Sequence, residues 1–195
     1  MAANLAGFAR RAIDGAGLRH AAVAILVSPY RRKATFVLTR RALTMRRNAG
    51  NYALPGGNCE PGEDAVDTAL RETAEELGVS GLHRDAALGR LDDFVTLGGH
   101  RVTPVVLWSD QALTLAPDPV EVHAAWRIPL AELDHPGSPR RLAHAGSNDP
   151  ILQMRLRGSW INAPTAAWVW QFREVALHGR ATRLDGVGQP EWTRG

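Results

Sequence analysis

Three glutamates, Glu72, Glu75 and Glu76, lie within five residues of one another, and a glycine-rich loop precedes them. Their spacing of i, i+3 and i+4 places the side chains on one face of a helix. Hard oxygen ligands gathered in this way suit Mg²⁺ or Mn²⁺. The loop Pro55-Gly56-Gly57 lets backbone groups approach a metal or a phosphate closely. The alternative is a solvated acidic face, on which the like charges repel one another.

A helix over residues 64–77 is expected to position these acids. Apolar or small residues recur there with the period of a buried stripe, namely at Val66, Leu70, Thr73 and Leu77. Asp64 is suited to cap the start of the helix, and Gly78 is suited to end it. We expect the stripe to pack into the core and the three acids to lie on the other side.

The same residues carry a resemblance to a known family. Gly57, Glu63 and the run from Arg71 to Val79 have the spacing of the complete Nudix box, so the chain resembles the Nudix hydrolases. Thr73 is the one soft departure, because the family usually has an aliphatic residue there. The resemblance implies an α/β (α+β) fold, in which a mixed sheet lies between helices as an α/β/α sandwich. It also implies hydrolysis of a diphosphate with Mg²⁺ or Mn²⁺ as cofactor.

The resemblance assigns roles residue by residue. Glu72, Glu75 and Glu76 are implied as metal ligands, together with the carbonyl of Gly56. Glu63 and Gly57 are implied as structural support. Glu72 and Arg71 are implied as catalytic residues, and Arg71 also braces the loop against the helix.

One carboxylate from outside the box often completes such sites. Glu121 is the first candidate for this catalytic role, and Asp92 or Asp93 is the second. The plain alternative for Glu121 is an acid at a strand edge. The general base stays open among Glu72, Glu121 and a hydroxide held by the metal.

A second signature precedes the box. The segment 38–57 is similar to the extra motif of the coenzyme A pyrophosphatase branch of the Nudix hydrolases. The matching positions are Leu38, Thr39, Arg41, Arg46, Gly50, Pro55, Gly56 and Gly57. Asn48, Asn51 and Tyr52 depart from the motif. Further similar segments lie downstream, so the resemblance covers about residues 22–135.

This branch implies cleavage of coenzyme A or its derivatives to 3′,5′-ADP and 4′-phosphopantetheine. Arg40, Arg41, Arg46 and Asn51 are the candidate substrate-binding residues, because arginine forms bidentate contacts with phosphate. The three departures keep open a different nucleoside diphosphate derivative, such as ADP-ribose, a dinucleotide or a modified nucleotide. A ligand-sensing domain without turnover is a third reading, which the full set of box acids disfavours.

Composition limits the other possibilities. The 195 residues suit one Nudix domain, with a core over about 20–135 and a C-terminal loop and helix over 136–195. A single cysteine, Cys59, excludes an intramolecular disulfide and fits the cytoplasm. No apolar run approaches the roughly 18 residues of a membrane span. A net charge of +3, and a basic run without interleaved aromatics, argue against nucleic-acid binding.

Further elements follow from hydrophobic patterning. We expect helices over 3–15, 129–133 and 165–178, strands over 21–28, 35–39 and 120–128, and a hairpin over 87–108. Residues 134–150 are rich in proline, glycine, serine and histidine and are expected to form a long loop. Trp160, Trp168 and Trp170 are expected in the core, with a base-stacking wall or the face of a homodimer as alternatives.

Overall fold

A mixed sheet of eight strands forms the centre of the protein in the computed structural model, which describes residues 1–45, 48–144 and 147–194. The strands are β1 (Arg19–Tyr30), β2 (Lys33–Arg41), β3 (Tyr52–Ala53), β4 (Gly56–Asn58), β5 (Ala87–Arg90), β6 (Phe94–Val95), β7 (His100–Trp108) and β8 (Val122–Pro129). Their main order is β3-β2-β1-β7-β5, and β8, β4 and β6 pair with β2, β1 and β7. Strands β1 and β7 are parallel, whereas the other pairs are antiparallel. The expected strands and hairpin are thus present.

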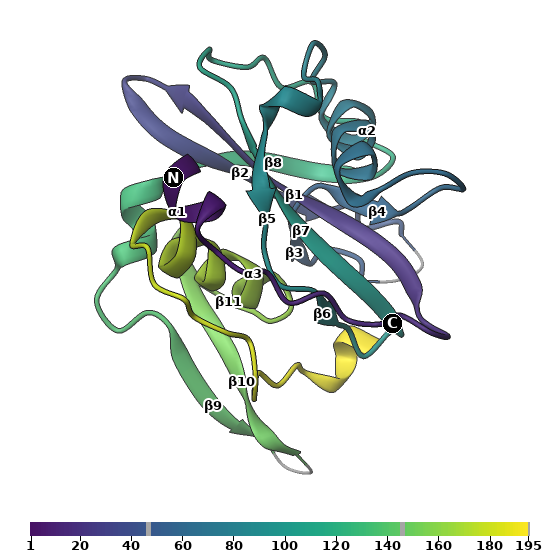
Figure 1. The fold of residues 1–195 in the computed structure, drawn as a ribbon, viewed down its shortest axis with the longest axis vertical. Coiled ribbons are helices and arrows are strands. Elements are labelled where there is room, and N and C mark those ends of the chain that lie inside the picture. Colours follow the sequence, from purple (N-terminus) through teal and green to yellow (C-terminus); the bar gives the residue numbers. More distant parts are fainter. Residues whose placement is uncertain (46–47, 145–146, 195) are drawn as a thin grey trace.

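Helices cover both faces of this sheet (Figure 1). Along β1, Ala22, Ala24 and Leu26 belong to one apolar cluster, which includes residues of α2 (Ala65–Leu77). The alternate residues Val23, Ile25 and Val27 belong to a second cluster with α3 (Thr165–Phe172). Neighbouring side chains of a strand point to opposite faces of the sheet. The buried strand β1 therefore contributes side chains to both apolar clusters, one on each face. The predicted sandwich with a mixed sheet is confirmed.

The region predicted as a loop over 134–150 contains strands, so that prediction is wrong. After a 3₁₀ helix (Leu130–Asp134), the antiparallel strands β9 (Arg140–His144), β10 (Ser147–Leu156) and β11 (Ser159–Asn162) form a second sheet. β10 buries Leu152, Met154 and Leu156 in the same cluster as α3. The gain from burying these side chains outweighs the turn-rich composition of residues 134–150.

The predicted helix over 3–15 is also wrong in its length, because α1 covers only Ala2–Ala6. Beyond it, the backbone amides of Arg11 and Ile13 donate to carboxylates of Asp92 (2.7 Å) and Asp93 (3.0 Å). Amides bound in this way are not available for helical hydrogen bonds. The segment therefore has no regular secondary structure and contacts Asp92 and Asp93 instead.

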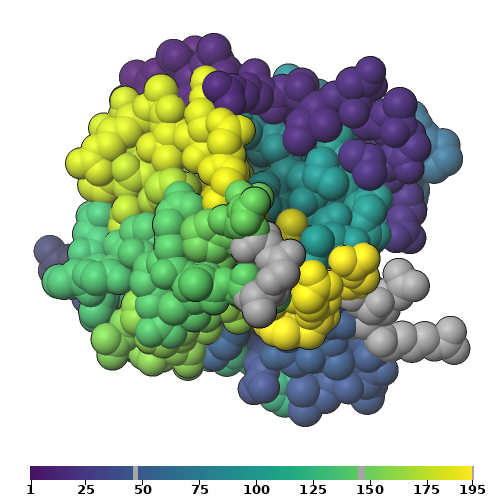
Figure 2. All heavy atoms as spheres, turned by 90° about the horizontal axis from the view of Figure 1, so that it is seen from below, coloured from purple at the N-terminus to yellow at the C-terminus, as the bar shows by residue number. Residues whose placement is uncertain are grey.

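The C-terminal part returns to the sheet. α3 continues as a π-helical turn (Arg173–Leu177), as expected for a helix over 165–178. The 3₁₀ helix Glu191–Arg194 follows, and Figure 2 shows this segment (yellow) beside the segment around residue 50 (blue). A shorter 3₁₀ helix covers Arg84–Ala86. Among the described helices, none is long and apolar enough to cross a membrane.

Candidate functional site

The glycine loop is held by close contacts that leave no room for side chains. At Gly56, with φ +156°, a Cβ atom would lie 2.3 Å from the Ala22 carbonyl oxygen. At Gly57, a Cβ atom would lie 2.3 Å from Oε1 of Glu72. Both glycines therefore let the backbone of β4 lie directly between β1 and the helix carboxylates.

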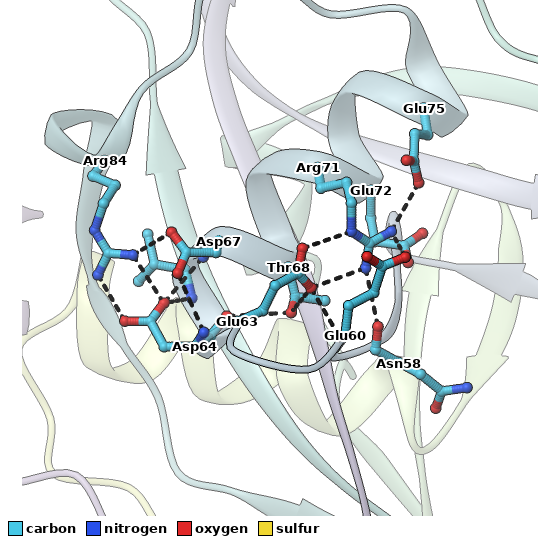
Figure 3. A network of polar contacts seen from close by, with 11 residues as sticks. Asn58, Glu60, Glu63, Asp64, Asp67, Thr68, Arg71, Glu72, Glu75 and Arg84 are labelled. Carbon is cyan, nitrogen blue, oxygen red and sulfur yellow. Dashed lines mark hydrogen bonds and ion pairs between the residues drawn. The ribbon is translucent and has the colours of Figure 1, made fainter.

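Helix α2 begins and ends as its sequence predicts. The Asp64 side chain accepts hydrogen bonds from the amides of Val66 and Asp67, and Asp67 accepts one from the Asp64 amide. This reciprocal cap defines the first turn, and Arg84 forms ion pairs with both acids (Figure 3). Gly78 ends the helix in the left-handed conformation. Residues close in sequence thus define both ends of α2. The helix therefore includes Glu72, Glu75 and Glu76, and the i, i+3 and i+4 spacing of these residues applies.

Arg71 connects the loop to three acids (Figure 3). Its guanidinium group donates to Glu63 (2.8 Å), Glu72 (2.9 Å) and Glu75 (2.8 Å), and to the Asn58 carbonyl (3.0 Å). The hydrogen bond from Arg71, followed by that from the Glu60 amide, lowers the pKa of Glu63 to about 2. Arg71 and Glu63 thus join loop and helix, as the resemblance implies.

A cavity of about 460 Å³ lies beside this network and is lined by Gly56, Glu72, Glu76, Glu121 and Arg41, among others. Glu72 and Glu76 come from α2, while Glu121 and Arg41 come from the neighbouring ends of β8 and β2. The Ala42 amide donates to the Glu121 carbonyl (2.8 Å), which joins these two ends. The structure therefore brings the first candidate for the outside carboxylate, Glu121, to the helix acids.

The three box acids differ in their surroundings. Glu75 is exposed, Glu72 is mostly buried and Glu76 is only 4% exposed. Burial, followed by repulsion from Glu72, raises the pKa of Glu76 to about 8, although Arg41 opposes the shift. Burial also raises the pKa of Glu72, against the effect of Arg71. Glu72 and Glu76 line the same cavity, as expected for residues on one helix face, but Glu76 is buried there rather than solvated.

The other candidates lie elsewhere. Asp92 and Asp93 are buried among arginines and hydrogen-bond donors and do not line this cavity. Arg40 donates a hydrogen bond to the Gly50 carbonyl (2.8 Å). The side-chain amide nitrogen of Asn51 donates to Oδ1 of Asn48 (3.4 Å). Arg46 lies outside the described residues.

A second cavity, of about 390 Å³, adjoins the first and shares Arg41 and Gly56 with it. Its wall combines β3, β11 and α3 with the C-terminal 3₁₀ helix. The lining residues include Asn51, Tyr52, Trp160, Asn162, Trp168 and Trp192. Sequence patterning missed this cavity, because its wall joins segments more than one hundred residues apart. The tryptophan-rich C-terminal region was the only signal for it.

The ligand chemistry of the first cavity fits a hard divalent cation, since its lining offers four carboxylates, those of Glu60, Glu72, Glu76 and Glu121, and a glycine loop. The repulsion among these acids is what a cation would relieve. Among the described residues, however, no three acidic, histidine or cysteine side chains are close enough to form a complete metal centre. The carboxylates would have to approach one another, and Arg71 at present holds Glu72 and Glu75.

The chain matches the model of the NUDIX domain over residues 18–149. It is 40% identical over 118 residues to the uncharacterized Nudix hydrolase NudL of Photorhabdus laumondii, covering 58% of this chain and 60% of that protein. It is also 37% identical over 106 residues to Nudix hydrolase 3 of Caenorhabditis elegans, covering 50% of this chain and 42% of that protein. The matches thus span about 60% or less of the length of these curated relatives.

The fold is similar to that of a solved MutT/nudix family protein from Enterococcus faecalis. That match has a TM-score of 0.58 and 17% identity, and it covers 88% of this chain and 68% of the other. At these identities the likeness concerns the arrangement of helices and strands. It supports the sandwich fold described above.

Proposed function

The chain belongs to the NUDIX domain family, and we propose that it is a divalent-metal-dependent pyrophosphohydrolase that cleaves the diphosphate of coenzyme A or a derivative. The products would be 3′,5′-ADP and 4′-phosphopantetheine. One observation carries the hydrolase proposal: Glu72, Glu76, Glu121 and Arg41 line one cavity beside the glycine loop. The similarity of residues 38–57 to the coenzyme A signature supports the choice of substrate.

In this proposal Glu72, Glu76 and the Gly56 backbone hold Mg²⁺ or Mn²⁺, and Glu75 joins them on release from Arg71. The cation would neutralise charge on the diphosphate oxygens and lower the pKa of the attacking water. Arg71 positions Glu72 while it also braces Glu63.

Arg41 lies where a phosphoryl oxygen would arrive. Its Nε is buried and has no hydrogen-bond partner among the described residues. Since a guanidinium group forms strong hydrogen bonds with phosphate, Arg41 suits the diphosphate. Arg40 braces the loop through Gly50 instead, so its contribution to binding is indirect. The proton of the attacking water would go to Glu121 or Glu72, or the cation would hold the water as hydroxide.

A second substrate class is favoured by one observation. Asn48, Asn51 and Tyr52, which depart from the coenzyme A signature, all line the second cavity. Their position beside the diphosphate site supports a different organic group there, as in ADP-ribose or a dinucleotide.

A substrate panel separates these proposals. The purified protein is incubated with Mg²⁺ or Mn²⁺ and coenzyme A, ADP-ribose, NADH or nucleoside triphosphates, and products are identified by chromatography and mass spectrometry. We expect 3′,5′-ADP and 4′-phosphopantetheine from coenzyme A. Brisk cleavage of ADP-ribose without cleavage of coenzyme A would contradict the leading proposal. Binding without any cleavage would indicate a sensing domain.

A further inference from the structure

Helix α2 carries two threonines whose side chains are completely buried, Thr68 and Thr73. Neither of them lines the candidate catalytic cavity. The hydroxyl of Thr73 has no hydrogen-bond partner among the described residues. The hydroxyl of Thr68, by contrast, lies 2.8 Å from Oε2 of Glu63 and 3.2 Å from the Asp64 carbonyl oxygen (Figure 3). Only the Thr68 hydroxyl therefore reaches a charged group of the loop that precedes the helix.

The single hydroxyl hydrogen of Thr68 is donated to Glu63. The pKa of Glu63 is lowered to about 2, so this carboxylate is ionised at neutral pH and only accepts hydrogen bonds. Glu63 is also the nearer of the two acceptors, and a charged acceptor forms the stronger hydrogen bond. The same oxygen of Glu63 accepts from the Glu60 amide (3.0 Å). One donor from the helix and one from the loop thus fix the orientation of this carboxylate.

The orientation of Glu63 determines which edge of Arg71 is occupied. Glu63 accepts hydrogen bonds from Nε (2.8 Å) and Nη2 (3.2 Å) of the guanidinium group. Nη1 is then the nitrogen that donates to Glu72 (2.9 Å) and Glu75 (2.8 Å). A guanidinium group released by Glu63 would be free to turn and bind Glu72 with two parallel hydrogen bonds. In that arrangement Arg71 would compete with a cation for the carboxylate.

We propose that Thr68 is a positioning residue for the metal site. Its hydroxyl orients Glu63, Glu63 restrains Arg71, and the restrained Arg71 leaves Glu72 and Glu75 accessible to a divalent cation. Since Thr68 does not line the cavity, its effect passes through these side chains. The inference rests on the proposed metal-dependent hydrolysis but not on coenzyme A as the substrate.

The first test measures the binding of Mn²⁺ by calorimetry, without substrate. Thr68→Val and Thr73→Val each remove one buried hydroxyl from the same helix and keep the shape of the side chain. Thr68→Val is expected to weaken Mn²⁺ binding about tenfold, as is typical when a residue that orients metal ligands is lost. Thr73→Val should bind within about twofold of the wild type. Thr68→Ser, which keeps the hydroxyl, should also stay within about twofold.

The second test separates positioning from a purely structural role. The Mg²⁺ concentration for half-maximal activity is measured with whichever diphosphate the substrate panel shows to be cleaved. In Thr68→Val it should rise about tenfold, while kcat and KM at saturating Mg²⁺ stay within about twofold of the wild type. A lower melting temperature with an unchanged Mg²⁺ requirement would overturn the proposal. Equal shifts in Thr68→Val and Thr73→Val would also overturn it.

A variant of Glu63 tests the route of the effect. In a Glu63→Gln background, Thr68→Val should weaken Mn²⁺ binding no further, because the charged group that Thr68 orients is already gone. A further tenfold loss there would show that Thr68 does not act through Glu63. If Thr68→Val proves poorly folded by thermal melting, Thr68→Ala replaces it, with the same weakening expected.

The wild-type titration distinguishes the two levels of the proposal. Absence of Mn²⁺ binding by the wild-type protein would overturn the metal-dependent function and the role of Thr68 with it. Binding by the wild type with unchanged affinity in Thr68→Val would overturn only the role of Thr68.

Discussion

In the described part of the chain, the pair Asp92 and Asp93 and the pair Glu72 and Glu76 are buried or mostly buried, and their surroundings differ. Asp92 accepts hydrogen bonds from Arg183 (2.8 Å), Gln171 (2.8 Å) and the Arg11 amide (2.7 Å). Asp93 accepts them from Arg10 (2.5 Å), Thr103 (2.6 Å) and the Ile13 amide. Each of the four carboxylate oxygens accepts at least one hydrogen bond, and the two residues connect the N-terminal segment and the segment after α3 to the sheet.

Glu72 and Glu76 form the contrasting pair. Among the described side chains, only Arg71 forms a hydrogen bond with Glu72. Glu76 receives a backbone hydrogen bond from Gly56, while Glu72 and Glu121 repel it. Burial acts to raise the pKa of Asp93, but its hydrogen bonds outweigh burial and lower it. In Glu76 burial prevails and the pKa rises. Satisfied acids stabilise a fold, whereas unsatisfied acids around a cavity indicate a site for a missing positive partner.

The largest effect is expected from Glu76→Gln. The substitution keeps shape but removes a carboxylate from the candidate metal site, so kcat/KM should fall about 10³-fold. Circular dichroism and thermal melting should show an intact fold. Hydrolysis near the wild-type rate would show that the metal assignment is wrong.

Glu121→Gln is expected to lower kcat/KM at the same site less than Glu76→Gln does. Glu121 contributes one carboxylate at the exposed rim of the cavity. A loss of about 10- to 100-fold, smaller than that of Glu76→Gln, is expected from a supporting ligand. Activity at the wild-type level would leave Glu121 as a plain strand-edge acid.

Asp93→Asn is expected to lower the stability of the fold and to leave the activity nearly unchanged, the opposite of Glu76→Gln. It leaves Arg10 without its buried partner and should lower the free energy of unfolding by about 3 kcal/mol. The kcat/KM per folded molecule should stay within about twofold, because Asp93 lies outside both cavities. Urea denaturation and steady-state kinetics on the same sample measure both quantities. A large loss of activity with unchanged stability would show that Asp93 acts in the functional site and not in stabilising the fold.

The sequence predicted α2 well because its signals are local. Asp64 and Gly78 define its ends within one turn, and the box spacing identified Glu72 and Glu76. The burial of Glu76 was not predictable from helical spacing. It depends on how β4 and the ends of β2 and β8 surround the C-terminal half of the helix.

Non-local pairing explains the larger errors. β9 and the start of β10 lie in a stretch with the composition of a loop, and they form strands because the later part of β10 packs on α3. Likewise, Trp168 is expected in the core from sequence and is buried there, yet it also lines a cavity whose wall includes residues of β3. No local pattern distinguishes a core tryptophan from one at a cavity wall.

The pH dependence of stability separates satisfied from unsatisfied acids. Hydrogen bonds lower the pKa of Glu63 from 4.5 to about 2. Its contribution to stability is therefore complete above about pH 4.5 and is lost as the pH falls toward 2. Asp93, whose pKa is also lowered, acts in the same direction. Glu63 and Asp93 therefore lower the free energy of unfolding only when the pH falls below the ordinary pKa values of their carboxyl groups.

Glu76 acts in the opposite direction, since its pKa rises from 4.5 to about 8 in the folded protein. The folded state then binds more protons than the unfolded state between these values, so stability falls as the pH rises through this window. We expect Glu76→Gln to remove this fall and to be more stable than the wild type at pH 8, by on the order of 2 kcal/mol. Urea denaturation of both proteins from pH 4 to 9, with EDTA present, measures the difference. Parallel curves across the window would mean that Glu76 is compensated as fully as Asp93, and the contrast between the two pairs would not hold.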